Sequence, residues 1–409
     1  VMTSSPCYPR MSRLLKNNLM DDVFNLENES FAQVDKLIEN QYSVNIPTKY
    51  YYRGKMRDGW INLTNPFRGT WVLGTPGSGK TFSVIEPIIR QHSAKGFALV
   101  VYDYKFPTLA RKLLYHYTKN KREKRIPEGC GFKMINFTHV EYSHRINPIQ
   151  KKYIPNLAAA SETASTLIES LQKGQAGNGG GSDDFFKKSS ENFLAAIIYF
   201  LTRYEIDAET GIGKYSSMAH VLAFLNLEYQ VIFDVLLTSP EIRPLLAPFQ
   251  TAYKNKAMDQ LEGMIGTLRV NAGRLATKEA FWIFSGDDFD LKVTDREHPN
   301  YLLIANDPEM ESINSSLNAL IINRLVTRVN SGEGKNIPVN ILLDELPTIY
   351  FHKIDRLVGT ARSNKVAVTL GFQELPQLEA DYGKIGMQKV ISVCGNVICA
   401  SARLKETLD

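Results

Sequence analysis

The eight residues GTPGSGKT, Gly74–Thr81, constrain the fold of this chain more than any other part of its sequence. They match the pattern G-x-x-x-x-G-K-[ST], and the apolar run TWVLG (70–74) leads into them as a buried strand would. A helical segment follows, and its apolar residues are Val84, Ile85, Ile88 and Ile89. Glycine amides and a helix N-terminus in this arrangement surround phosphate groups. The motif therefore predicts an α/β domain that holds a nucleotide at the edge of its sheet.

Every residue of this loop is a candidate for nucleotide binding: Gly74, Thr75, Pro76, Gly77, Ser78, Gly79, Lys80 and Thr81. We expect Lys80 to reach the β- and γ-phosphates and the Thr81 hydroxyl to ligate Mg²⁺. The cofactors predicted from the loop are ATP and Mg²⁺.

A second motif, VNILLDEL, ends an apolar run with Asp344 and Glu345. Ligands in open α/β sheets lie at the carboxyl ends of the strands, so this pair predicts a site shared with the loop. We expect Asp344 to bind Mg²⁺ through water and Glu345 to act as the general base for an attacking water. Small nucleotide kinases need no such base, so the pair argues against them.

Two further residues are weaker catalytic candidates. Gln373 closes the apolar run VAVTLGF, where it is either a sensor of the γ-phosphate or part of a solvated loop. Arg362 is expected near the end of the helix before that run, and a lone arginine there is more often a surface charge than a catalytic group.

The fold class predicted is α/β, with a doubly wound, mostly parallel sheet. The runs that indicate its buried strands are 70–74, 97–104, 132–137, 301–306, 339–344 and 366–372. A helix is expected over 309–330, a hairpin over 43–65 and a helix around 30–39.

Residues 148–291 break the strand–helix rhythm and predict an all-α insertion between two strands of the core. The helices expected there are 157–172, 184–204, 217–238 and 254–276, with the glycine-rich stretch 174–184 irregular. The domain boundaries that follow are 1–42 for a polar and helical N-terminal segment, 43–147 with 292–409 for the nucleotide-binding domain, and 148–291 for the insertion.

Composition narrows the choice of partners only slightly. The net charge of +5 permits a nucleic-acid partner without requiring one. Basic residues outnumber acidic ones seven to one in 111–125, which favours a solvated helix face but also fits a DNA-binding patch. The longest apolar run, 193–201, is about half of the roughly 20 residues that a membrane helix needs, so we expect a soluble piece.

Several motifs together resemble the conjugative coupling proteins of the TraG/TraD family, especially forms from mobile elements of Bacteroides-like bacteria. The resemblance runs from about residue 43 to the C-terminus and is carried by NPFRGTWVLGTPGSGKT, VVYDYKFPTLAR, ILLDELPTI, ARSNKVAVTLGFQELPQLEADYG and CGNVICASARLKET. It implies a RecA-like P-loop ATPase with an inserted all-α domain. It also implies Gln373 as the sensor and Arg362 as a finger that completes the neighbouring subunit's site.

The resemblance further implies a place and partners. Such proteins sit on the cytoplasmic face of the bacterial inner membrane as homo-hexamers. They bind single-stranded DNA with its relaxase and pass it to the components of a type IV secretion channel. The family's transmembrane helices are not recognisable in this sequence, and whether this piece assembles alone stays open.

Two alternative functions remain open. One is an FtsK-like translocase acting on duplex DNA, although no winged-helix DNA reader is recognisable and the large helical insertion is unusual for that class. The other is a receptor for the relaxase complex in which nucleotide acts as an assembly switch with little hydrolysis.

Overall fold

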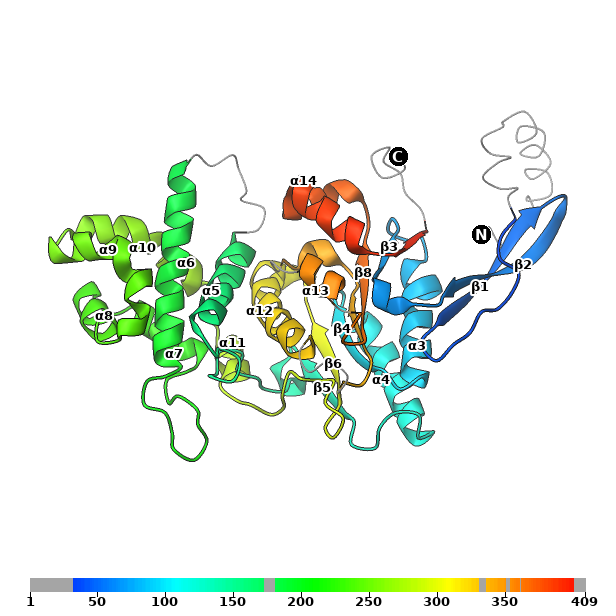
Figure 1. Ribbon diagram of the computed structural model, residues 1–409, viewed down its shortest axis with the longest axis horizontal. Coiled ribbons are helices and arrows are strands. Elements are labelled where there is room, and N and C mark those ends of the chain that lie inside the picture. The colour runs from blue at the N-terminus through cyan, green and yellow to red at the C-terminus, as the bar shows by residue number, and fades with distance from the viewer. Residues whose placement is uncertain (1–31, 173–180, 331–335, 351–353, 361, 401–409) are drawn as a thin grey trace.

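The computed structural model describes residues 32–172, 181–330, 336–350, 354–360 and 362–400, apart from the side chains of 181–184, 355 and 356. Its centre is a seven-stranded sheet in the order β5-β6-β4-β7-β8-β3-β9 (Figure 1). The strands are β3 (Thr70–Leu73), β4 (Ala98–Asp103), β5 (Gly131–Ile135), β6 (Asn300–Ala305), β7 (Val339–Leu343), β8 (Val366–Phe372) and β9 (Asn396–Cys399). The six apolar runs expected to be strands are therefore confirmed.

All neighbouring strands of this sheet run parallel. Strand β8 lies between β7 and β3, so the segments that follow these three strands meet at one edge. The loop 74–81 follows β3, Asp344 follows β7 and Gln373 follows β8. Parallel pairing thus gathers three sequence motifs that are separated by up to about 300 residues.

Helices cover both faces of the sheet and make a three-layer domain (Figure 1). On one face lie α3 (Glu86–Ala94) and α4 (Thr108–Arg122), which pack against each other and against β4. On the other lie α12 (Glu311–Val329), α13 (Ile354–Thr360) and α14 (Leu375–Val393). The apolar side chains form two clusters, one for each face, which explains why the strands read as nearly unbroken apolar runs.

Between β5 and β6, which lie next to each other in the sheet, the described residues form seven α-helices. They are α5 (Leu157–Leu171), α6 (Gly181–Leu201), α7 (Met218–Leu225), α8 (Tyr229–Leu236), α9 (Arg243–Lys254), α10 (Met258–Gly273) and α11 (Lys278–Phe284). Helices α6 and α8–α10 lie at the end of the molecule farthest from the hairpin (Figure 1).

Three details of the helical prediction were wrong. The helix expected over 217–238 is broken, because Arg269 of α10 donates hydrogen bonds to the carbonyl oxygens of Leu225 and Leu227 (3.0 and 2.7 Å) and so stabilises the end of α7. The helix expected over 254–276 is also shorter than predicted: Lys254 is the last residue of α9, and α10 begins only at Met258. Helix α6 begins at Gly181, inside the stretch expected to be irregular, while 173–180 lie outside the described residues.

The helical region formed by α5–α11 packs against the α/β core through contacts between α5 and α12. Arg324 of α12 is fully buried and donates hydrogen bonds to the carbonyl oxygens of Tyr153 and Ala159 (both 3.1 Å) and to Thr163 Oγ1 (2.5 Å). Burial lowers the pKa of the guanidinium to about 10, and the charge of Glu162 partly offsets this. The side chain still carries its proton at neutral pH, so a buried cation joins the two parts.

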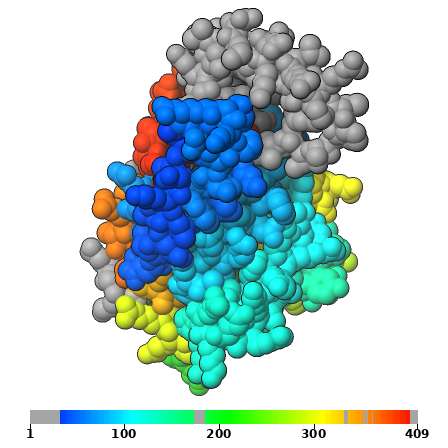
Figure 2. All heavy atoms as spheres, turned by 90° about the vertical axis from the view of Figure 1, so that its right-hand side faces the viewer, coloured from blue at the N-terminus to red at the C-terminus, as the bar shows by residue number. Residues whose placement is uncertain are grey.

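A two-stranded hairpin, β1 (Val44–Tyr52) and β2 (Lys55–Leu63), extends from the opposite end and confirms the expected hairpin. Its turn places Arg53 and Gly54 at φ of 51° and 76°, a conformation that glycine adopts readily. Figure 2 shows this end of the molecule, where the hairpin (blue) and the region of α4 (cyan) form the surface.

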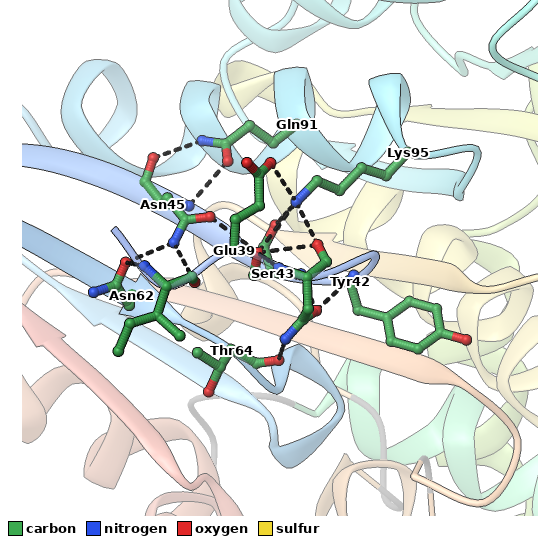
Figure 3. Close-up of polar contacts among 10 residues, drawn as sticks. Glu39, Tyr42, Ser43, Asn45, Asn62, Thr64, Gln91 and Lys95 are labelled. Carbon is green, nitrogen blue, oxygen red and sulfur yellow. Dashed lines mark hydrogen bonds and ion pairs between the residues drawn. The ribbon is translucent and has the colours of Figure 1, made fainter. Parts of the chain in front are cut away.

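The base of the hairpin is anchored to α3 by a polar network (Figure 3). Gln91 exchanges hydrogen bonds with the backbone of Asn45 (2.9 and 2.8 Å), and Lys95 Nζ donates to the carbonyl oxygen of Ser43 (2.7 Å) and pairs with Glu39 (3.3 Å). Since α3 continues from the loop 74–81, this network joins the hairpin to the helix that leaves the nucleotide loop.

The helix expected around 30–39 is not formed in its described part, residues 32–39. The reason is that its backbone pairs with the hairpin: the Trp60 amide donates to the Val34 carbonyl oxygen (2.8 Å), and Asn62 bonds both Lys36 and Ile38. These partners compete with helical hydrogen bonds. Among the described residues, no helix is long and apolar enough to span a membrane.

Candidate functional site

The loop Gly74–Thr81 forms the turn that its glycines predict. Gly77 and Gly79 have φ of 80° and 83°, where a side chain would be strained. A Cβ atom at Gly74 would lie 2.4 Å from Ser78 Oγ and 3.1 Å from the Cβ of Ala400, so a larger residue there would require Ser78 to move. The Gly74 amide donates to the carbonyl oxygen of Phe372 (3.2 Å), which fixes the loop to the end of β8.

Lys80 joins the loop to the two strands beside it. Its Nζ lies 3.3 Å from the carbonyl oxygen of Phe372, 3.5 Å from that of Asp344 and 3.7 Å from Glu345 Oε2. The side chain is largely buried. The structure therefore brings the lysine and the acidic pair of the sequence prediction into one site, at the predicted edge of the sheet.

Glu345 and Gln373 are also in direct contact. The amide of Gln373 donates a hydrogen bond to Glu345 Oε2 (3.1 Å), while Glu345 Oε1 is buried and has no partner among the described residues. Burial raises the pKa of the Glu345 carboxyl, and the charge of Lys80 and the bond from Gln373 partly oppose that rise. The arrangement holds one carboxylate oxygen in place and leaves the other available to accept a proton.

Asp344 is the candidate metal-binding carboxylate. Burial raises its pKa, and the positive charges of Lys80, Lys105 and Lys112 oppose the rise. Its Oδ1 is buried without a partner among the described residues. A buried carboxylate oxygen with no donor beside it is a suitable place for a cation or for the water that a cation holds.

A magnesium site here would rely on the nucleotide for most of its ligands. Within the described part of the chain, no group of three or more His, Cys, Asp or Glu side chains is arranged to hold a metal. Mg²⁺ bound through one or two protein groups, water and phosphate oxygens needs no such group. Thr81, the first residue of the helical turn η2 (Thr81–Ile85), and Asp344 fit that mode.

The structure corrects the position expected for Arg362. Helix α13 ends at Thr360, and Arg362 lies exposed in the turn before β8, with its carbonyl oxygen accepting from the Lys365 amide (3.2 Å). This turn is at the amino end of β8, whereas the nucleotide loop is at the carboxyl end. Arg362 therefore lies at the opposite edge of the sheet from the site in its own chain.

Sequence reasoning missed one residue at the site. Asp103 ends β4, the strand beside β7, and is completely buried. Its signal was available, since an acid closing an apolar run is the same pattern that identified Asp344. The basic run 111–125 begins on α4, which follows Asp103, and Arg111, Lys119 and Arg122 are among its exposed residues.

These features define a class of protein: a P-loop fold of the NTPase type, with a parallel α/β sheet and an inserted helical region. Residues 20–409 match the model of the type IV secretory system conjugative DNA transfer family, and the chain belongs to that family. It is thus a conjugative DNA-transfer protein of type IV secretion.

Solved structures show the same fold. The plasmid coupling protein TrwB in complex with the ATP analogue ADPNP is 15% identical, with a TM-score of 0.59 over 81% of this chain and 70% of that one. TrwB with ADP and Mg²⁺ is 16% identical, with a TM-score of 0.57 over 81% and 69%. VirB4 of Thermoanaerobacter pseudethanolicus is 13% identical, with a TM-score of 0.53 over 91% and 87%. No curated protein sequence matches the chain significantly.

Proposed function

We propose that this chain is the ATP-hydrolysing motor of a coupling protein that delivers relaxase-bound single-stranded DNA to a type IV secretion channel. The observation that carries the proposal is the contact of Lys80 and Gln373 with Glu345, beside the unpartnered oxygen of Asp344. A nucleotide switch needs only to bind phosphate. A buried base held by a polar neighbour serves hydrolysis.

Each side chain then has a role in hydrolysis. Lys80 neutralises charge on the β- and γ-phosphates, and Glu345 accepts a proton from the attacking water at its free Oε1. Gln373 fixes the other oxygen and carries any movement of Glu345 to β8. Thr81 and Asp344 would hold Mg²⁺, which would supply further positive charge at the phosphates.

The partners and setting belong to the same proposal. They are single-stranded DNA with a relaxase, the channel components, a hexameric ring and the cytoplasmic face of the inner membrane, in an element of the Bacteroides type. In such a ring Arg362, on the far edge from its own nucleotide loop, would serve a neighbour's site. The domain boundaries at 43–147 with 292–409 and at 148–291 also remain proposals.

The proposal predicts ATPase activity that single-stranded DNA stimulates. Activity is measured without DNA, with single-stranded DNA and with duplex DNA, at one low salt concentration because phosphate contacts depend steeply on salt. Stronger stimulation by duplex DNA would favour an FtsK-like translocase. Tight nucleotide binding without turnover under all three conditions would favour the assembly switch.

Two variants test the site itself. Lys80→Ala should weaken nucleotide binding and stop hydrolysis, because phosphate charge is left unpaired. Glu345→Gln should bind ATP like the parent and lose at least 100-fold in hydrolysis, on the order of a general base's contribution. A Glu345→Gln variant that hydrolyses ATP at the parent rate would contradict the assignment of the base.

A further inference from the structure

Asp103 occupies a special position at the edge of the sheet. In the parallel pairing of β4 with β7, Tyr102 lies opposite Leu343, so Asp103 and Asp344 are the next residues of two adjacent strands. The Asp344 amide also points to the carbonyl oxygen of Tyr102 (3.4 Å). Two carboxylates therefore follow neighbouring strands at the edge that holds the nucleotide loop.

The two oxygens of Asp103 have different environments. Oδ2 accepts hydrogen bonds from the amides of Leu109 and Ala110 (both 2.9 Å) and thereby fixes the first turn of α4. Oδ1 is buried and has no hydrogen-bond partner among the described residues, although the backbone of Lys105 lies near enough to the carboxyl to lower its pKa. A helix cap explains the first oxygen only, and a fully buried acid with a free oxygen is costly unless something else binds it.

The charges around Asp103 indicate that the group bound by Oδ1 is a cation. Burial is the main cause that raises the pKa of Asp103, to about 6, and the charge of Asp344 raises it further. Two buried acids that repel each other are relieved by a cation placed near both.

We propose that Asp103 is a positioning residue of the Mg²⁺–nucleotide site. Its Oδ2 holds the first turn of α4, and its Oδ1, with the negative charge, favours the metal ion and the metal-bound water beside Asp344. The inference rests on the proposed nucleotide-binding function and adds a residue to it. It also ties α4, with its exposed basic residues, to the metal site. Lys112 of α4 also forms an ion pair with Glu86, the first residue of α3. Helix α4 is therefore joined both to the end of β4, through Asp103, and to the helix that follows the nucleotide loop.

The test removes the charge and keeps the cap. Asn and Ser accept N-terminal amide hydrogen bonds about as well as Asp, so Asp103→Asn and Asp103→Ser should retain the first turn of α4. Binding of a fluorescent non-hydrolysable ATP analogue is titrated with Mg²⁺ for each variant and the parent. We expect the Mg²⁺ concentration for half-maximal binding to rise about tenfold, as when an outer-shell partner of a metal is lost. Binding in EDTA and the unfolding midpoint without nucleotide should not fall below the parent's, because the cap is kept and the repulsion between two buried acids is removed.

Asp307→Asn is the matched control. Asp307 follows the next strand, β6, and its Oδ1 accepts from the Glu309 amide (3.0 Å), so it caps a helical turn at the same edge. Its Mg²⁺ curve should match the parent's. Parent-like Mg²⁺ curves for both Asp103 variants would show that Asp103 is only a cap and would overturn the inference. Failure of the parent itself to bind the analogue with Mg²⁺ would instead overturn the proposed function and this inference with it.

Discussion

Mildly acidic pH should destabilise this protein through His92, because the unfolded chain can take up a proton there that the folded core resists. His92 lies on α3 and is 1% exposed, and its ring stacks on Phe97 with 4.1 Å between the centroids. Asn340 Nδ2 lies 2.9 Å from His92 Nδ1, and Thr369 donates to Asn340 Oδ1 (3.2 Å). The Asn340 amide is therefore oriented to donate, and His92 Nδ1 must accept. A proton on that nitrogen removes the bond and leaves a charge in the core.

The magnitude follows from the pKa of His92. Burial, with the charge of Lys95, lowers it from 6.5 to about 3. A histidine whose pKa is depressed by folding contributes stability that is present above the unfolded pKa and is lost as pH falls towards the folded value. Between pH 7.5 and pH 5.0 the unfolded chain gains nearly one more proton than the folded chain, which corresponds to about 2 kcal/mol.

The assay is urea unfolding of the parent and of His92→Gln at both pH values. Glutamine can still accept from Asn340 but does not titrate, so the parent should lose about 2 kcal/mol more than the variant on acidification. His298→Gln, at an exposed position, is the control and should follow the parent. Equal losses for parent and His92→Gln would refute the reasoning, because His92 would then titrate alike in both states.

Four further substitutions test other parts of the structure. Gly371→Ala should abolish nucleotide binding, since a Cβ there would lie 2.2 Å from the Asp344 carbonyl oxygen, whereas Gly263→Ala in the open middle of α10 should raise the unfolding midpoint slightly. Arg324→Leu should lower the free energy of unfolding by about 2–4 kcal/mol, because the buried carbonyl oxygen of Tyr153 loses its donor and that of Ala159 loses one of its donors; an unchanged urea midpoint would contradict this. Arg362→Ala should bind ATP normally yet hydrolyse it about 10³-fold more slowly or worse, and mixing it with Glu345→Gln should restore some activity. Absence of rescue in mixtures shown to assemble together would leave Arg362 an ordinary surface charge.

The sequence by itself determined the elements and the chemistry of the central domain. Runs such as VNILLD and VAVTLGF have apolar residues at nearly every position, because helices cover both faces of the sheet. Six strands could therefore be located from these apolar runs alone. The loop 74–81 predicted a nucleotide site, since its glycines and lysine have few other uses in that order. Asp344 and Glu345 could be placed beside it by the rule that parallel strands present their carboxyl ends at one edge.

Only the tertiary structure decided which groups touch. The contact of Gln373 with Glu345 and the position of Asp103 beside Asp344 depend on the strand order β4-β7-β8-β3, which local sequence does not encode. The same holds where predictions failed. Residues 32–39 are not helical because the hairpin takes their backbone hydrogen bonds, and α7 ends where Arg269 reaches the carbonyl oxygen of Leu225. In each case a partner distant in sequence outweighs a local preference of a few tenths to about 1 kcal/mol per residue, and such partners exist only once the chain is folded.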